Sequence, residues 1–133
     1  MKTKIFLRMA SVMMLLHALG HTMGVLTWKQ APNARVAGVI AGMLNEHFDF
    51  MSRSVSVGMF FEGYGISMIF VLLLLTVLLW QLANAPVKNT LSVMAIFLLA
   101  LAVTEYIYFF PLAGTMTLVA GACTGLAGFQ LKP

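Results

Sequence analysis

The chain has 133 residues, of which 61% are hydrophobic and only 9% are charged, and its mean hydropathy is +0.95. About a quarter of the residues in a soluble domain are charged, so the composition excludes a soluble protein and indicates an integral membrane protein. The net charge of +4 is the balance of four Asp and Glu against eight Lys and Arg, which are scattered singly around apolar runs. This pattern sets membrane topology, and it excludes a nucleic-acid-binding surface.

Residues 5–28 form the first predicted span, because this largely apolar stretch makes about 36 Å of helix. A cleavable signal peptide is the competing interpretation, since a basic start precedes an apolar run. The span is favoured because Arg8, His17 and His21 interrupt the apolar core that such a peptide needs. Trp28 and Lys29 are typical of the interfacial end of a span.

Residues 34–48 are predicted to form an amphipathic helix that starts after Asn33. Apolar residues such as Val36, Ile40 and Met43 follow a helical period. This helix is expected to lie on the membrane surface or across the mouth of the bundle. The segment that ends it mixes aromatic and titratable side chains, which suits a connector at the interface, a lid or a surface that binds a partner. The candidate lid residues are His47, Asp49 and Arg53.

Three further spans are predicted over residues 58–82, 91–110 and 112–131. Pro111 forces a tight turn between the last two, and Gly121 and Gly125 suit close helix packing. The single cysteine, Cys123, excludes an intramolecular disulfide. The fold class is therefore an all-α, polytopic membrane protein, a bundle of four transmembrane helices forming one domain over residues 1–133, with the amphipathic helix between the first two spans.

The basic residues predict the orientation of the bundle, because the cytoplasmic side is enriched in Lys and Arg. One side has five of them and the other side has three. We therefore expect both termini in the cytoplasm and an extracytoplasmic amphipathic helix. The five are Lys2, Lys4, Arg8, Lys88 and Lys132, and the three are Lys29, Arg35 and Arg53.

Ionisable side chains inside the spans are the main candidates for a functional site, because such groups are retained at membrane depth only with a polar partner. His17 and His21 are four residues apart and point the same way on a helix. Measured from the middle of each span, His21 and Glu105 both lie about 6 to 7 Å toward the outer side. The predicted polar cluster comprises His17, His21, Glu62, Tyr64, Glu105 and Tyr108.

Several interpretations of this cluster stay open. His21 and Glu105 are either a buried pair that fixes helix register or a proton relay or acid–base pair. His17 and His21 also have the spacing of a metal-ligand pair, which Glu105, Glu62 or His47 would complete. Haem needs a ligand from elsewhere, because two histidines on one helix cannot clasp the iron from both sides. Metal and haem are not favoured, since this spacing is common by chance.

The chain resembles a family of small bacterial four-helix membrane proteins over about residues 10–82. The resemblance rests on His17-Ala-Leu-Gly-His-Thr-Met-Gly24, on Glu46-His-Phe-Asp-Phe-Met51 and on Gly63-Tyr-Gly65 leading into Trp80. It implies a location in the bacterial inner membrane and imports no activity, because the family has none assigned. A Trp-Asp pair typical of the family is missing after Arg53-Ser54, so either Glu62 takes over the role of its aspartate or this chain has lost that role.

A binding or accessory membrane protein is the favoured function, because the cluster has few polar groups and no recognisable catalytic motif. Its expected partners are the lipid bilayer, a lipophilic small molecule, and a second copy of the chain or a larger membrane complex. A membrane-embedded enzyme using His21 and Glu105 and a proton-coupled carrier are the alternatives. A carrier of this kind is expected to show broken helices or paired halves, and the sequence indicates neither.

Overall fold

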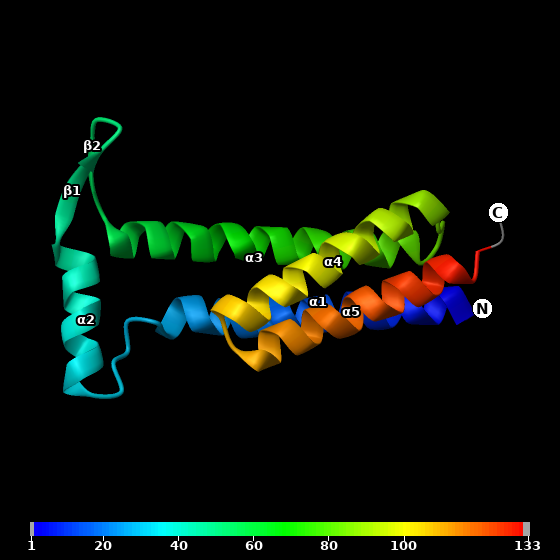
Figure 1. Cartoon of the computed structure of the whole chain (residues 1–133), viewed down its shortest axis with the longest axis horizontal. Coiled ribbons are helices and arrows are strands. Elements are labelled where there is room, and N and C mark those ends of the chain that lie inside the picture. Colours follow the sequence, from blue (N-terminus) through cyan, green and yellow to red (C-terminus); the bar gives the residue numbers. More distant parts are fainter. Residues whose placement is uncertain (1, 132–133) are drawn as a thin grey trace. The chain divides into compact units, whose positions relative to one another are not determined.

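The computed structural model describes residues 2–131, and helices dominate this part of the chain (Figure 1). Four of the helices are long and apolar enough to cross a membrane, so the protein is a multi-pass membrane protein. A short amphipathic helix and a β-hairpin lie between the first two. In chain order the elements are α1 (Lys2–Thr27), α2 (Ala34–Asn45), β1 (His47–Phe50), β2 (Arg53–Ser56), α3 (Val57–Leu82), α4 (Lys88–Tyr108) and α5 (Pro111–Phe129).

The four predicted spans are confirmed, with ends that shift by up to three residues. The local signals for two helix starts are also confirmed. Asn33 is the N-cap of α2, and its side chain accepts a hydrogen bond from the backbone N–H of Val36 at 3.0 Å. Pro111 occupies the first turn of α5, where its missing N–H costs nothing. Lys132, which contributes to the predicted orientation, lies outside the described residues.

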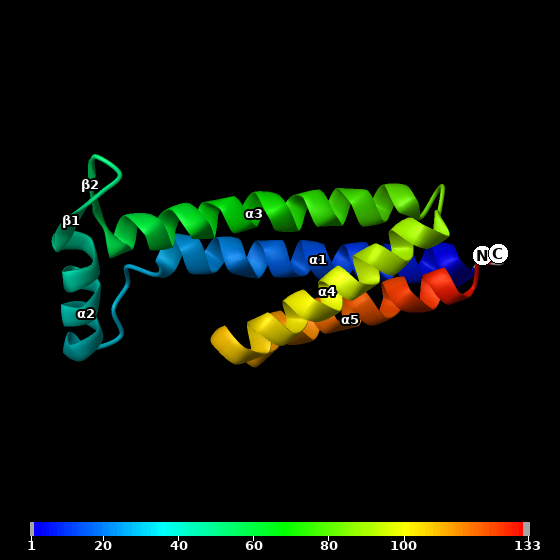
Figure 2. The ribbon, with the colours of Figure 1, turned by 45° about the horizontal axis from the view of Figure 1, so that its top comes forward.

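The described chain divides into two compact units, and α1 and α3 contribute residues to both. Unit 1 contains the residues up to Leu19 and those from Val71 onward, and unit 2 is Gly20–Phe70. In unit 1, α4 and α5 lie side by side (Figure 2). A Cβ at Gly121 would lie 3.1 Å from the Cδ2 atom of Leu99 and 3.2 Å from the Cβ of Leu98, so a larger residue would force these neighbours to shift by a few tenths of an ångström. The prediction that small residues of the last span allow close packing is confirmed.

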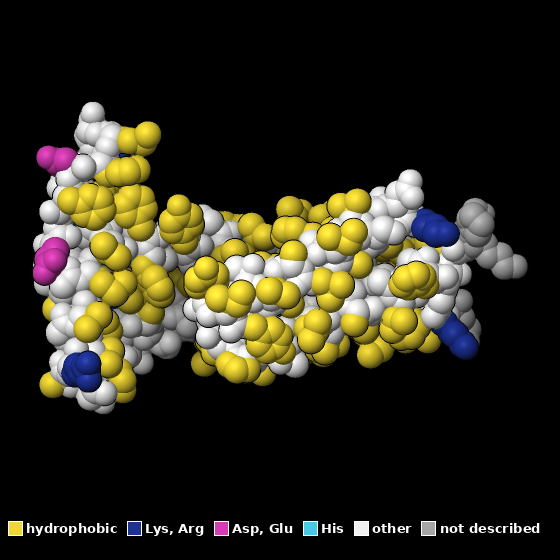
Figure 3. Space-filling view, viewed as in Figure 1, with side chains coloured by type: hydrophobic (Ala, Val, Ile, Leu, Met, Phe, Trp, Pro, Cys, Tyr) yellow, Lys and Arg dark blue, Asp and Glu magenta, His cyan; other side chains and the backbone are white. Residues whose placement is uncertain are grey.

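The outward faces of the long helices are apolar, as expected for surfaces in contact with lipid tails. Hydrophobic side chains cover the long helices on the face shown in Figure 3. The Lys and Arg side chains visible on this face lie at or beyond the ends of those helices. Large exposed apolar residues on α3 and α4 include Phe70, Leu74, Val93 and Ile96. The core of unit 1 contains leucine, methionine and alanine side chains from all four long helices, among them Leu7, Met14, Leu72, Leu91, Leu98, Ala120 and Ala127.

In unit 2, the segment after α2 forms an antiparallel hairpin that was not predicted. The amphipathic helix was expected to reach residue 48, but α2 ends at Asn45 and β1 begins at His47. Met51 and Ser52 both have positive φ angles, 49° and 66°, as the two central residues of a tight hairpin turn require. The turn was missed because Met-Ser lacks the Asn or Gly that normally signals this geometry.

Candidate functional site

An imidazole, a hydroxyl and a carboxyl meet in the core of unit 1. The Nδ1 atom of His17 on α1 lies 3.0 Å from the Oγ1 atom of Thr117 on α5. The same Nδ1 is 3.8 Å from the Oε1 atom of Glu105 on α4, and the Thr117 hydroxyl also hydrogen-bonds to the Glu105 side chain. All three residues are buried, and Thr117 is 0% exposed. We call His17, Thr117 and Glu105 the buried triad.

The hydroxyl of Thr117 is the central group of the triad, because it has one hydrogen to donate and can also accept. With a proton on Nδ1, His17 donates to Thr117, and the hydroxyl donates to the carboxylate of Glu105. With the proton on Glu105, the carboxyl donates to Thr117 and the hydroxyl donates to Nδ1. The Oε2 atom of Glu105 is buried without a hydrogen-bond partner among the described residues. The triad thus accommodates one shared proton in either of two hydrogen-bond directions.

The structure pairs Glu105 with His17, one helical turn before the residue predicted from span midpoints. Near one end of unit 1, Arg8 of α1 donates to Asn84, which lies just before α4. The two helices differ in length, since α1 has 26 residues and α4 has 21. Counted from the first residue of each helix, Glu105 lies about 25.5 Å along α4, midway between His17 at about 22.5 Å and His21 at about 28.5 Å along α1. Depth along the helices therefore does not choose between the two histidines, and only the packing of the helices decides that Glu105 meets His17.

His21 meets a different helix from the one predicted. In unit 2, its Nε2 atom lies 3.0 Å from the backbone carbonyl oxygen of Gly65 on α3, so an Nε2–H tautomer donates to that oxygen. A Cβ at Gly65 would lie 2.8 Å from Val25 of α1, so the absence of a side chain lets the two helices approach. The expectation that both histidines have polar partners on other helices is confirmed.

Glu62, on α3, forms an ion pair in unit 2 with Lys29, which lies just after the end of α1. The Nζ atom of Lys29 donates to the two carboxylate oxygens of Glu62 at 3.0 and 3.1 Å, and both side chains are at least 40% exposed. Next to this pair, the Trp28 ring packs against Phe61 with centroids 5.0 Å apart, and the Lys29 ammonium lies 5.4 Å from the Trp28 centroid. This arrangement fits the predicted interfacial anchor at Trp28 and Lys29.

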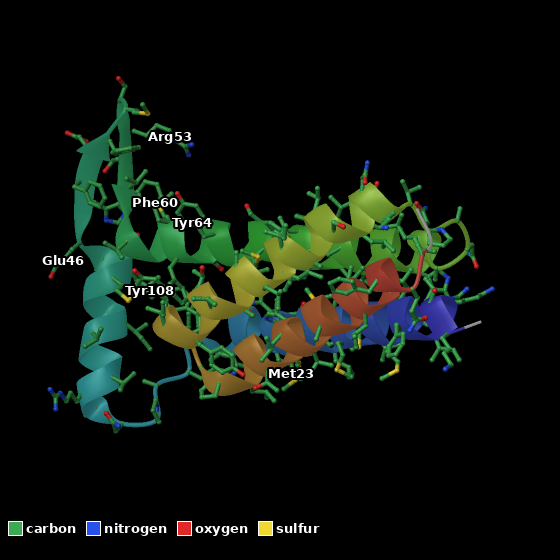
Figure 4. The ribbon with its side chains drawn as sticks, turned by 45° about the vertical axis from the view of Figure 1, so that its right-hand side comes forward. Met23, Glu46, Arg53, Phe60, Tyr64 and Tyr108 are labelled. Atoms are coloured by element: carbon green, nitrogen blue, oxygen red, sulfur yellow. The ribbon has the colours of Figure 1, made fainter. Side chains whose placement is uncertain are left out.

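The two tyrosines of the predicted cluster point outward within their own units. Tyr64 is 74% exposed and Tyr108 is 76% exposed, and Figure 4 shows both rings projecting from their helices. A tyrosine that lines a buried polar site is expected to be covered and hydrogen-bonded. Of the six residues of the predicted cluster, His17 and Glu105 are the buried ones.

The predicted lid residues lie on the hairpin or at its start. The Nδ1 atom of His47 lies 3.0 Å from the carbonyl oxygen of Asn45, and Asp49 is exposed. Arg53 begins β2 and lines a cavity of about 230 Å³ with Val55, Met59 and Phe60. Two residues of the hairpin contact the ring of Phe60 on α3. Phe48 stacks on it with ring centroids 6.2 Å apart, and Phe50 meets it edge-on with centroids 5.5 Å apart.

The metal interpretation gains no ligand set from the structure. Among residues 2–131, no group of three or more His, Cys, Asp or Glu side chains is arranged to hold a metal ion. Each of the two histidines has instead a hydrogen-bond partner on another helix.

No protein-family model, curated protein or solved structure matches this chain. The family resemblance noted in the sequence therefore stays a prediction, and the site has to be judged by its own geometry.

Two residues that matter in this geometry were missed in the sequence. Thr117 was taken as part of a small-residue packing helix, although a hydroxyl deep in an apolar span signals a polar partner. Phe60 falls inside the predicted span over residues 58–82 and was given no role of its own. Its role depends on the hairpin, which the sequence did not predict.

Proposed function

We propose that the protein is a membrane binding or accessory protein that holds a lipophilic, anionic ligand through a platform at the membrane interface. The platform comprises α2, the hairpin and the first turn of α3, residues 34–60. One observation supports this function above others: apolar and aromatic side chains gather on one side of the platform and acidic side chains on the other (Figure 3).

Several contacts within unit 2 support the platform. Helix α2 has no buried residue and runs across the direction of the first half of α3 (Figures 1 and 2). An amphipathic helix in this attitude lies flat on a bilayer that α3 crosses. Figure 4 shows Arg53 on the side of the hairpin toward the body of α3, and Glu46 on the opposite side. Arg53 therefore has the position of a cation that meets an anionic group at the membrane surface.

The cavity beside Arg53 supports the chemistry of the ligand. Its other walls are Val55, Met59 and Phe60, which are apolar or aromatic. A guanidinium next to such walls recognises an amphiphile, because the anionic end pairs with arginine and the hydrocarbon part packs against the ring. By the distribution of Lys and Arg, the platform lies on the extracytoplasmic side. The family resemblance adds the bacterial inner membrane to this proposal.

The experiment is mass spectrometry of organic extracts from the purified protein, compared between variants. We expect a lipophilic anion at close to one per chain, reduced about tenfold or more in Arg53→Gln and in Phe60→Ala. Arg35→Gln is the matched control, because Arg35 is an exposed arginine of the same platform at the start of α2, outside the cavity. Equal amounts in all variants, or no stoichiometric compound in the wild type, would reject the function.

Proton transfer through the buried triad is a second candidate function. It is favoured by one observation, the single hydroxyl of Thr117 between an imidazole and a carboxyl. This geometry gives His17 the role that the sequence assigned to His21. The test is proton uptake by vesicles that contain the protein, a trapped pH-sensitive dye and an imposed potential. Thr117→Val should abolish the protein-dependent flux, and wild-type vesicles that are no leakier than empty ones would exclude this function.

A further inference from the structure

Unit 1 contains a groove that plays no part in the functions proposed above. It has a volume of about 630 Å³ and follows the first half of α1. Apolar side chains and one aromatic ring make up most of its lining, and two cationic side chains complete it. The apolar set is Ile5, Met9, Val12, Met13 and Trp80, and the cationic pair is Lys4 and Arg8.

Arg8 is held in place at the rim of this groove. Its guanidinium carbon lies 3.2 Å from the centroid of the Trp80 ring, a cation–π contact. Its Nη2 atom donates to the side-chain oxygen of Asn84 at 3.2 Å. A guanidinium has five N–H donors in a planar fork, so further N–H groups of Arg8 remain available to donate to an anion. Because the side chain is already ordered, it loses little rotamer freedom when an anion binds.

No acidic side chain balances the charge at this end of unit 1. The four acidic residues of the chain are Glu46, Asp49, Glu62 and Glu105. Only Glu105 belongs to unit 1, and it lies far along α4 in the buried triad. Lys4 and Arg8 therefore present two positive charges beside an apolar groove, and no acidic side chain of the described residues lies near them.

We propose that this groove binds one anionic phospholipid. The phosphate lies between Lys4 and Arg8, and one acyl chain lies along the apolar residues of α1. A phospholipid contacts both the cationic and the apolar part of the lining, whereas a soluble phosphate contacts only the cationic part. A zwitterionic phospholipid places its phosphate there too, but the cationic part of its own headgroup offsets that charge, so it gains less from the two cations. The groove should therefore select lipids by headgroup charge.

Trp80 provides a direct readout, because it lines the groove and the chain has only two tryptophans. In a Trp28→Phe background, Trp80 fluorescence reports contact with brominated lipids, which quench tryptophan at short range. The protein is placed in vesicles with increasing fractions of either dibromo-phosphatidylglycerol or dibromo-phosphatidylcholine. We expect half-maximal quenching at an anionic fraction about fivefold or more below that of the zwitterionic lipid, since a surface charge is worth about this factor.

The preference for the anionic lipid is the ratio of the two half-maximal fractions. Lys4→Gln should lower this preference several-fold, and it leaves the contact between Arg8 and Trp80 in place. Arg8→Gln should bring the preference near one, and circular dichroism shows whether that variant folds. Lys88→Gln is the matched control, because Lys88 starts α4 and lines a different groove. Its preference should equal that of the parent protein.

Three results would overturn the proposal. The first is equal quenching by the two lipids in the parent protein. The second is a loss in Lys88→Gln as large as in Lys4→Gln, which would show diffuse surface charge. The third is protection of Trp80 from both lipids that grows with the protein-to-lipid ratio, which would show that a second copy of the chain fills the groove. None of these results affects the platform, which belongs to unit 2.

Discussion

Replacing Thr117 with valine removes the central hydroxyl of the buried triad and keeps the shape of the side chain. The hydroxyl bonds to both His17 and Glu105, so the substitution breaks two interhelical hydrogen bonds. In a membrane protein each is worth about 0.6 kcal/mol on average and at most about 1.7. A buried polar group left without a partner costs about 1–3 kcal/mol. We therefore expect Thr117→Val to lower the free energy of unfolding by about 1–3 kcal/mol.

Thr124→Val is a matched control on the same helix. Thr124 is also 0% exposed, but its hydroxyl donates only to the carbonyl oxygen of Ala120 in its own helix, at 2.8 Å. Removing a bond of this local kind has little effect on a helix. The assay is unfolding in mixed micelles of mild detergent and increasing dodecyl sulfate, followed by circular dichroism. A loss in Thr117→Val no larger than in Thr124→Val would refute the triad.

Three further predictions concern other contacts. Gly121→Val should cost about 1–3 kcal/mol of unfolding free energy in the same assay, because its Cβ would crowd the Cβ of Leu98 at 3.2 Å; unchanged stability would exclude this packing. Met51→Asn with Ser52→Gly should relieve the backbone strain of the two positive φ angles. Amide hydrogen exchange in the hairpin should then slow severalfold, and equal or faster exchange would argue against the turn. Glu62→Gln should cost less than about 1 kcal/mol, since its ion pair is exposed, and a loss above about 2 kcal/mol would contradict that assignment.

The spans and their local starts were predictable because the signals are local. A run of apolar residues long enough to cross a bilayer can hardly be anything but a membrane helix. The Asn33 cap and the Pro111 start depend on hydrogen bonds within a single turn. The hairpin was not predictable, because Met51 and Ser52 adopt positive φ without the residues that favour it. There, contacts with Phe60 outside the hairpin compensate for weak turn chemistry.

The candidate site shows the same division. Two histidines in an apolar span required polar partners on other helices, and this follows from the cost of an unpaired polar group in lipid. Which groups serve as those partners was decided only by the tertiary structure. His17 meets Thr117 and Glu105, and His21 meets the carbonyl of Gly65. The physical reason is that periodicity reports which face of a helix is polar, whereas register depends on how the helices pack against one another, which no single span encodes.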